Sequence, residues 1–266
     1  MTYAVETFGL TKEFIPTKGF YHVVSNPFRK GEPILAVDNV TLQIKRGEIF
    51  SIAGPNGAGK TTLMKILSCL ITPSRGNANV AGYNILKEDN AVKSSIGLIS
   101  GDERSFYWRL TLKQNLYFFA ALYNISAAQT RIKIAELAPL LEIESYLDRR
   151  FQECSTGVKQ KLAIMRSLLN DPQVLFMDEP TKSLDTTTVK SLKNFIKEKL
   201  VRQQGRTVFF SSHNLNEVES FADRIAIMHK GQIRACGTLE DLCDKINSPL
   251  ARLANIYDKI INTGGI

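Results

Sequence analysis

The stretch GPNGAGKTT, residues 54–62, decides the fold. It matches the pattern G-x-x-x-x-G-K-[ST] and stands between a short apolar run, IFSIAG, and a helix-like segment, KTTLMKILSCLI. A strand that leads through a glycine-rich loop into a helix is the setting in which backbone N–H groups surround phosphate groups. A chance glycine turn is the alternative, and the strand and helix on its two sides strongly disfavour it.

This loop predicts a phosphate site in which Lys60 reaches the β- and γ-phosphates of a nucleotide and the Thr61 hydroxyl takes Mg²⁺. The residues predicted to bind the nucleotide here are Gly54, Pro55, Asn56, Gly57, Ala58, Gly59, Lys60, Thr61 and Thr62.

A second apolar run, VLFMDEP at 174–180, ends in two acidic residues. Strand ends in parallel sheets face the ligand, so Asp178 can orient Mg²⁺ directly or through a water molecule. Glu179 stands next to it and can polarise an attacking water. An acidic cap at a strand end would explain these residues on their own, but the phosphate loop upstream favours the catalytic interpretation.

His213 closes a third apolar run, TVFFSSH. A histidine at a strand end is more often a bystander than a functional group. We expect this strand to lie beside the one that ends in Asp178 and Glu179, which would let the imidazole meet a γ-phosphate.

The stretch ECSTGVKQKLAIMRSLL, residues 153–169, reads as a helix start. Ser155 stands where an N-cap would, and Gly157 removes bulk in the first turn. Free N–H groups at such a start suit a bound anion. The phosphate loop already holds a nucleotide within its own copy of the chain, so this second helix start can serve a nucleotide held by another copy. Capping of its own helix by Ser155 is compatible with that role.

Length and composition fit one large intracellular domain. The chain has 266 residues, 44% of them hydrophobic, and a formal charge of +8 that is spread over the sequence and favours solubility over a particular anionic partner. Its four cysteines form no C-x-x-C pair, which predicts a reduced chain without zinc or disulfides. No apolar run approaches membrane-spanning length and the N-terminus lacks a signal-peptide layout, so we expect a chain that neither crosses a membrane nor is exported by itself.

Strands and helices alternate along most of the chain, which predicts an α/β fold with a mainly parallel sheet and helices on both faces. A helix-rich block at about 103–170 interrupts this alternation and is interpreted as a subdomain. The stretch RIAIMHKGQIRACGT reads as a β-hairpin, and the helix that follows residue 185 is expected to end at Gly205.

Together these motifs make the chain resemble the nucleotide-binding subunits of ABC transporters over almost its whole length. GPNGAGKTT resembles the Walker A motif, VLFMDEPT the Walker B motif with its catalytic glutamate, KSLD at 182–185 the D-loop, His213 the switch histidine, and CSTGVKQK at 154–161 the signature motif. No other P-loop family combines these motifs in this order.

The resemblance implies the domain organisation. We expect a single ABC-type P-loop NTPase domain over 1–266, with an α/β core that has a mainly parallel sheet, an antiparallel β subdomain and a helical subdomain. The expected parts are the core at 1–102 and 171–245, the helical subdomain at about 103–170 and a C-terminal helical tail at 246–266.

The resemblance also implies the chemistry. ATP and Mg²⁺ are the expected cofactors, and Lys60, Glu179 and His213 the expected catalytic residues. Two copies would enclose two ATP molecules as a homodimer, and Ser155 and Gly157 of each copy would close the site of the other. The dimer would sit peripherally at the cytoplasmic face of the cell membrane and power a separate integral membrane permease.

Two departures from the family pattern stand out. In the signature motif, the residues that differ are Cys154, Thr156, Val158 and Lys161, and those that agree are Ser155, Gly157 and Gln160. Family members also place a Gln after the strand IGLIS, whereas SGDERSFYWRL at 100–110 has none. We expect Asp102 or Glu103 to take its place at Mg²⁺, because a carboxylate can coordinate that ion.

By the same resemblance, the adenine ring should stack on Phe14, with Tyr21 as the alternative. The turn-rich stretch 15–33, which contains Tyr21 and separates two strand-like segments, is longer than usual. Such a long link is similar to the one in ATPases of ABC-2-type exporters, including those of polysaccharide and teichoic acid. It is either a surface that meets the permease or lipid headgroups, or an insertion without a function of its own.

The expected function is therefore that of an ATP-hydrolysing exporter subunit whose permease groove lies around Phe106–Leu112. One alternative is a soluble ABC ATPase that acts on nucleic acid; we expect no nucleic acid, because the chain has no second cassette and no long coiled-coil or zinc insertion. Another is a non-hydrolysing partner in a heterodimer, which the intact Lys60, Asp178, Glu179 and His213 disfavour. Drug, glycan, lipid and peptide substrates all stay open.

Overall fold

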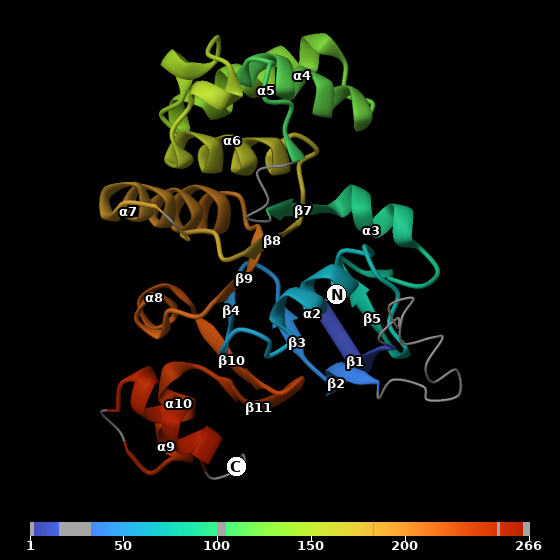
Figure 1. Cartoon of the computed structure of the whole chain (residues 1–266), viewed down its shortest axis with the longest axis vertical. Coiled ribbons are helices and arrows are strands. Elements are labelled where there is room, and N and C mark those ends of the chain that lie inside the picture. Colours follow the sequence, from blue (N-terminus) through green and yellow to red (C-terminus); the bar gives the residue numbers. More distant parts are fainter. Residues whose placement is uncertain (1–2, 16–32, 100–104, 183, 249–250, 263–266) are drawn as a thin grey trace, which may run out of the picture.

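The computed structural model describes residues 3–15, 33–99, 105–182, 184–248 and 251–262 (Figure 1). Asp102, Glu103 and Tyr21 lie outside the described residues, as does nearly all of the stretch 15–33.

The larger of two sheets forms the centre of the molecule. Its strand order is β11-β10-β4-β9-β8-β7, and all neighbours are parallel except the hairpin β10–β11. The strands are β4 (Ile49–Ala53), β7 (Ile96–Ile99), β8 (Val174–Asp178), β9 (Thr207–Ser212), β10 (Arg224–His229) and β11 (Gln232–Gly237). The predicted parallel core sheet and the predicted hairpin are both confirmed.

The smaller sheet is antiparallel, as the resemblance implies. Strand β1 pairs with β2, β3 and β5, and β5 pairs with β6. The strands are β1 (Tyr3–Phe14), β2 (Ile34–Val40), β3 (Gln43–Lys45), β5 (Arg75–Val80) and β6 (Tyr83–Asn84). The glycine-rich loop follows β4 of the larger sheet and leads into α2, and the chain then returns to the smaller sheet at β5.

Helices surround the larger sheet. They are α2 (Lys60–Leu67), α3 (Asp89–Ser95), α7 (Thr186–Asn194), α8 (Leu215–Phe221), α9 (Leu239–Lys245) and α10 (Leu253–Asn262). Helix α7 continues as a π-helical stretch, η4 (Phe195–Gln203), and the chain turns at Gly205, whose φ is +65°. The predicted end of this helix at Gly205 is therefore confirmed.

The middle block is helical. It contains α4 (Leu112–Leu122), α5 (Ala127–Leu140), α6 (Thr156–Leu168) and two short 3₁₀ helices, η2 (Glu144–Tyr146) and η3 (Phe151–Glu153). Figure 1 shows α4, α5 and α6 together at the top, with α7 and β7 beneath them and most of the other strands lower still. Thr111 and Ser126 cap α4 and α5 with reciprocal bonds to Gln114 and Gln129, which satisfies N–H groups that the first helical turn leaves free.

The central strands of the larger sheet are covered on both faces. Every residue of β4 and β9 is buried. Phe209 of β9 contacts Phe50 and Phe176 of the two adjacent strands edge to face, with ring centroids 5.5 and 5.7 Å apart. Polar functional groups of these strands are therefore found mainly at the strand ends. In the described part of the chain, no helix has the length and apolar character to span a bilayer.

Candidate functional site

Three neighbouring strands of the larger sheet end level with one another. Strand β9 pairs in parallel with β4 on one side and β8 on the other, with Ser212 opposite Ala53 and Ser211 opposite Asp178. The glycine-rich loop, the acidic pair and His213 follow directly after these strand ends. The prediction that the His213 strand lies beside the strand ending in Asp178 is confirmed.

The glycine-rich loop requires glycine at two positions. A β-carbon on Gly54 would lie 2.3 Å from the carbonyl oxygen of Met228, and one on Gly59 would lie 2.2 Å from that of Ala36. Gly59 also has a φ of +107°, a backbone angle that residues with a β-carbon rarely adopt. It stands at the N-cap of α2, where no side chain accepts a hydrogen bond from the first turn. These free N–H groups and the positive end of the helix dipole fit a phosphate group.

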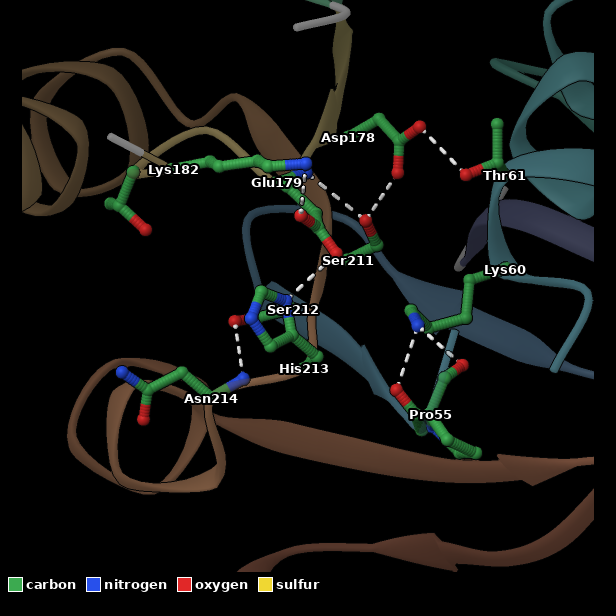
Figure 2. A network of polar contacts seen from close by, with 12 residues as sticks. Pro55, Lys60, Thr61, Asp178, Glu179, Lys182, Ser211, Ser212, His213 and Asn214 are labelled. Carbon is green, nitrogen blue, oxygen red and sulfur yellow. Dashed lines mark hydrogen bonds and ion pairs between the residues drawn. The ribbon is translucent and has the colours of Figure 1, made fainter. Parts of the chain in front are cut away.

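Lys60 is buried at the start of α2, with 6% of its surface exposed. Its Nζ donates to the carbonyl oxygens of Gly54 at 2.7 Å and Pro55 at 3.0 Å (Figure 2). Burial lowers the pKa of Lys60, and the negative charges of Glu179 and Asp178 oppose that shift. A buried ammonium held by two neutral carbonyls is incompletely compensated, which favours binding of an anion nearby.

Asp178 joins the helix α2 to the strand β9. Its Oδ2 accepts a hydrogen bond from the Thr61 hydroxyl at 2.8 Å, and its Oδ1 accepts one from the Ser211 hydroxyl at 2.5 Å (Figure 2). The Ser211 hydroxyl also accepts from the backbone N–H of Glu179 at 3.1 Å. A hydroxyl and a carboxylate in contact are the oxygen donors that Mg²⁺ prefers, so Thr61 and Asp178 could hold this ion.

The carboxylate of Glu179 contacts the imidazole of His213 and lies near the ammonium of Lys182. Its Oε1 lies 2.9 Å from Nδ1 of His213, and its Oε2 lies 3.7 Å from Nζ of Lys182 (Figure 2). Its backbone has a φ of +50°, which is uncommon outside glycine and is concentrated at functional sites. The turn directs this carboxylate from the end of β8 toward the imidazole at the end of β9.

The second predicted anion site begins α6. Ser155 is the N-cap, and its hydroxyl accepts from the N–H of Val158 at 3.4 Å, which confirms the predicted cap. A β-carbon on Gly157 would lie 3.5 Å from the Thr188 hydroxyl, an ordinary contact distance. Helix α6 lies in the upper helical block, apart from α2 (Figure 1). Within the described part of one chain, Ser155 bonds Val158 and the nearest side chain to a β-carbon on Gly157 is that of Thr188 of α7, so neither contact joins them to the glycine-rich loop.

Phe14 is the last residue of β1 and is 41% exposed. The ammonium of Lys12 lies over its ring, 5.1 Å from the ring centroid. The ring is accessible from the solvent, and its adenine contact stays a prediction.

Sequence reasoning missed the contacts that three side chains make with the site or its flanks, although Gln160 and Lys182 lie in motifs that it named. Ser211 bonds both acidic residues, Lys182 approaches Glu179, and Gln160 of α6 donates to the carbonyl oxygen of Pro180 at 2.9 Å. A signal for Ser211 was present, because two serines end an otherwise apolar strand. Nothing local in the sequence pairs Lys182 with Glu179 or Gln160 with Pro180.

Comparison with known proteins identifies the family. Residues 37–182 match the family described as ABC transporter. The chain is 36% identical over 219 residues to the ABC transporter ATP-binding protein NatA of Bacillus subtilis (strain 168), with 82% of this chain and 88% of NatA covered. It is 33% identical over 210 residues to the linearmycin resistance ATP-binding protein LnrL of the same organism, with 79% of this chain and 67% of LnrL covered.

Solved structures give the same result. The ATP binding subunit of an ABC transporter superposes with a TM-score of 0.80 at 25% identity, covering 97% of this chain and 99% of that chain. The ATP-binding cassette MJ0796, a dimer in a post-hydrolysis state bound to ADP and Pi, superposes with a TM-score of 0.74 at 27% identity, covering 88% and 98%. The resemblance seen in the motifs therefore holds for the fold, and the chain belongs to the ABC transporter family as one of its ATP-binding, ATP-hydrolysing cassettes.

Proposed function

We propose that this chain is the ATPase subunit of an ABC exporter, and that two copies close around two ATP molecules to drive a separate membrane permease. The observation that carries the proposal is the convergence of Lys60, Asp178, Glu179 and His213 at the ends of adjacent parallel strands. This set supplies phosphate binding, metal binding and a base within one site.

Lys60 and the N–H groups at the start of α2 would bind the β- and γ-phosphates. The incompletely compensated ammonium and the absence of a side-chain cap on α2 support this role. Thr61 and Asp178 would hold Mg²⁺ through the two oxygens that contact each other. Bound Mg²⁺ supplies neutralisation of the charge that develops on the phosphate oxygens during transfer.

Glu179 would take a proton from the attacking water. Its turn at the end of β8 and its contacts with His213 and Lys182 limit the directions in which its carboxylate can point. To donate through Nδ1 to the ionised carboxylate and through Nε2 to a phosphate oxygen at once, His213 would have to carry a hydrogen on both ring nitrogens, as an imidazolium does.

Ser155 and Gly157 would act on a nucleotide held by another copy of the chain. Two observations support this: α6 lies apart from α2 within one chain (Figure 1), and Ser155 caps the N-terminus of α6, where backbone N–H groups suit an anion. The dimeric state of the related cassette MJ0796 points the same way.

The proposal also states that the transporter is an exporter and that the chain docks on its permease at the membrane. The name of LnrL describes a resistance protein, which fits export of a drug-like substrate. In the segment Phe106–Leu112, Tyr107 and Trp108 are 50% and 57% exposed, although both are large and partly apolar. An exposed aromatic pair on the helical block suits docking of a permease at the cytoplasmic face of the membrane.

Purification of the tagged chain from native membranes in a mild detergent tests this proposal. We expect a polytopic membrane protein to accompany the chain, and we expect Trp108→Ala together with Tyr107→Ala to lose it while ATPase turnover persists. Leu122→Ala is the matched control, because Leu122 is 64% exposed at the end of α4. Recovery of bound nucleic acid without a membrane protein, together with a salt-dependent shift of labelled DNA or RNA, would contradict the proposal.

A further inference from the structure

Glu217 of α8 is a buried carboxylate that contacts two segments of the chain, one beside Glu179 and the other beside His213. It is 8% exposed; its Oε1 accepts from the Thr181 hydroxyl at 2.7 Å and its Oε2 accepts from the Ser212 hydroxyl at 2.9 Å. Thr181 follows Glu179 by two residues, and Ser212 directly precedes His213. We propose that Glu217 is a positioning residue that sets the geometry between Glu179 and His213.

The segment that follows Glu179 is a turn, so no strand pairing holds it in place. The N–H of Lys182 donates to the carbonyl oxygen of Glu179 at 3.1 Å, and the N–H of Leu184 donates to that of Thr181 at 3.2 Å. These bonds shape the turn from within. The bond from Thr181 to Glu217 attaches the turn to α8, which lies beyond the neighbouring strand in the sequence.

The His213 side is held through Ser212. The Ser212 hydroxyl accepts from the N–H of Asn214 at 3.1 Å (Figure 2). It also donates to Glu217, so one side chain constrains the backbone before and after His213. Because one carboxylate receives both hydroxyls, a shift of either flank is transmitted to the other. A displacement of about 1 Å in a catalytic group is enough to slow a reaction by about a hundredfold.

A cation balances the buried charge of Glu217. Nζ of Lys193 lies 3.9 Å from its Oε1 and donates to the Ser220 hydroxyl at 3.3 Å. Burial lowers the pKa of Lys193, and Glu217 opposes that shift. With this ammonium beside it, the carboxylate acts as an acceptor at both oxygens, which fixes the direction of both hydroxyl donors.

The test variant is Glu217→Gln, which turns one oxygen into an amide donor and leaves one of the two hydroxyls without its acceptor. We expect kcat for ATP hydrolysis to fall by about tenfold to about a hundredfold. KM for ATP and the ATP-dependent rise in Tm should stay unchanged, because Lys60 and the loop are untouched.

The matched control is Glu219→Gln on the same helix. Glu219 accepts from the N–H of Leu253 at 2.9 Å and so ties α8 to α10 rather than to the catalytic flanks. We expect wild-type kcat in this variant. Equal kcat in Glu217→Gln and Glu219→Gln would overturn the inference, as would a loss of the ATP-dependent Tm rise in Glu217→Gln.

Two further variants keep the inference testable should Glu217→Gln fail to fold. Thr181→Val and Ser212→Ala each remove one hydroxyl from the same carboxylate, and each should lower kcat without raising KM. Thr181→Val added to Glu217→Gln should cost little more than Glu217→Gln alone, because the two act as a unit. Wild-type kcat in both single variants would overturn the inference.

The inference rests on the proposed roles of Glu179 and His213. Glu179→Gln distinguishes a failure of the proposed function from a failure of the positioning role of Glu217. Full turnover in Glu179→Gln would contradict the proposed function itself. Loss of turnover in Glu179→Gln with wild-type kcat in Glu217→Gln, Thr181→Val and Ser212→Ala would contradict the positioning role of Glu217 alone.

Discussion

The imidazole of His213 contacts the carboxylate of Glu179, with Nδ1 2.9 Å from Oε1. The two residues follow the ends of β9 and β8, which are parallel neighbours in the sheet. The His213 side chain is 54% exposed, whereas the Glu179 side chain is 18% exposed. The more accessible imidazole can therefore meet a ligand while it holds the more sheltered carboxylate.

Replacement of His213 by Ala should lower ATPase turnover by about a hundredfold, because the carboxylate of Glu179 loses the contact that positions it and a displacement of about 1 Å costs about that much. The ATP-dependent rise in Tm should persist, because the phosphate loop is unchanged. His229→Ala, which alters a histidine at the end of β10, should keep wild-type turnover. Steady-state ATPase assays on the two variants check this, and similar rates in both would argue against a role for the His213–Glu179 contact.

Lys60→Ala should abolish the stabilisation that ATP with Mg²⁺ gives to the wild type. Ligand present at a hundredfold excess over Kd stabilises a protein by about 2.7 kcal/mol, which is a shift of several degrees in Tm. Lys60 supplies the buried cation at the loop, so its removal should abolish this shift. Lys65→Ala, an exposed change on the same helix, should keep it. A full shift in Lys60→Ala would mean that the phosphates bind elsewhere.

Ser211→Ala should lower both stability and turnover. The buried Ser211 hydroxyl donates to Asp178 and accepts from the N–H of Glu179. Its loss removes both hydrogen bonds, each of which contributes about 1 kcal/mol. Ser51→Ala in the adjacent strand β4 is the control. Its buried hydroxyl has no hydrogen-bond partner within the described part of the chain, so this change should be neutral or stabilising. Chemical denaturation of both variants measures the difference, and equal stabilities would contradict this account of Ser211.

The sequence predicted those parts of the site that a local pattern defines. The glycine-rich loop, the acidic pair and the cap Ser155 can each be predicted from residue spacing and from the strand or helix beside them. The neighbour relation of β8 and β9 followed from strand alternation. Ser211 and Glu217 escaped, because their roles come from contacts with residues 33 and 36 positions away in sequence. Such contacts depend on strand register and helix placement, which single-sequence patterns do not determine.

Gly157→Ala should separate folding from dimerisation. Gly157 lies in the first turn of α6, and an added methyl group would meet the Thr188 hydroxyl at an ordinary distance of 3.5 Å. Because Ala is the better helix former, the nucleotide-free chain should be as stable as the wild type or more stable by up to about 1 kcal/mol. If the partner's nucleotide approaches this backbone closely, ATP-dependent dimers should weaken. Thermal melts and light scattering measure the two effects, and unchanged dimerisation would show that no close approach occurs here.

The central claim is that the start of α6 closes a nucleotide site on another copy of the chain. Glu179→Gln should keep the shape of the site while removing the base, so ATP stays uncleaved and holds a dimer together. Ser155→Arg added to this variant places a long side chain where the partner's γ-phosphate would fit. Ser126→Arg in the same background is the matched control, because Ser126 caps α5 in the same helical block.

Light scattering with and without ATP, on samples whose ATP binding is measured in parallel, tests this claim most directly. We predict that Glu179→Gln and Glu179→Gln/Ser126→Arg form dimers with ATP and return to monomers without it. Glu179→Gln/Ser155→Arg should bind ATP as a monomer, because Lys60 and Thr61 are intact. ATP-dependent dimers of Glu179→Gln/Ser155→Arg, or failure of that monomer to bind ATP, would contradict the claim that α6 acts across the dimer interface.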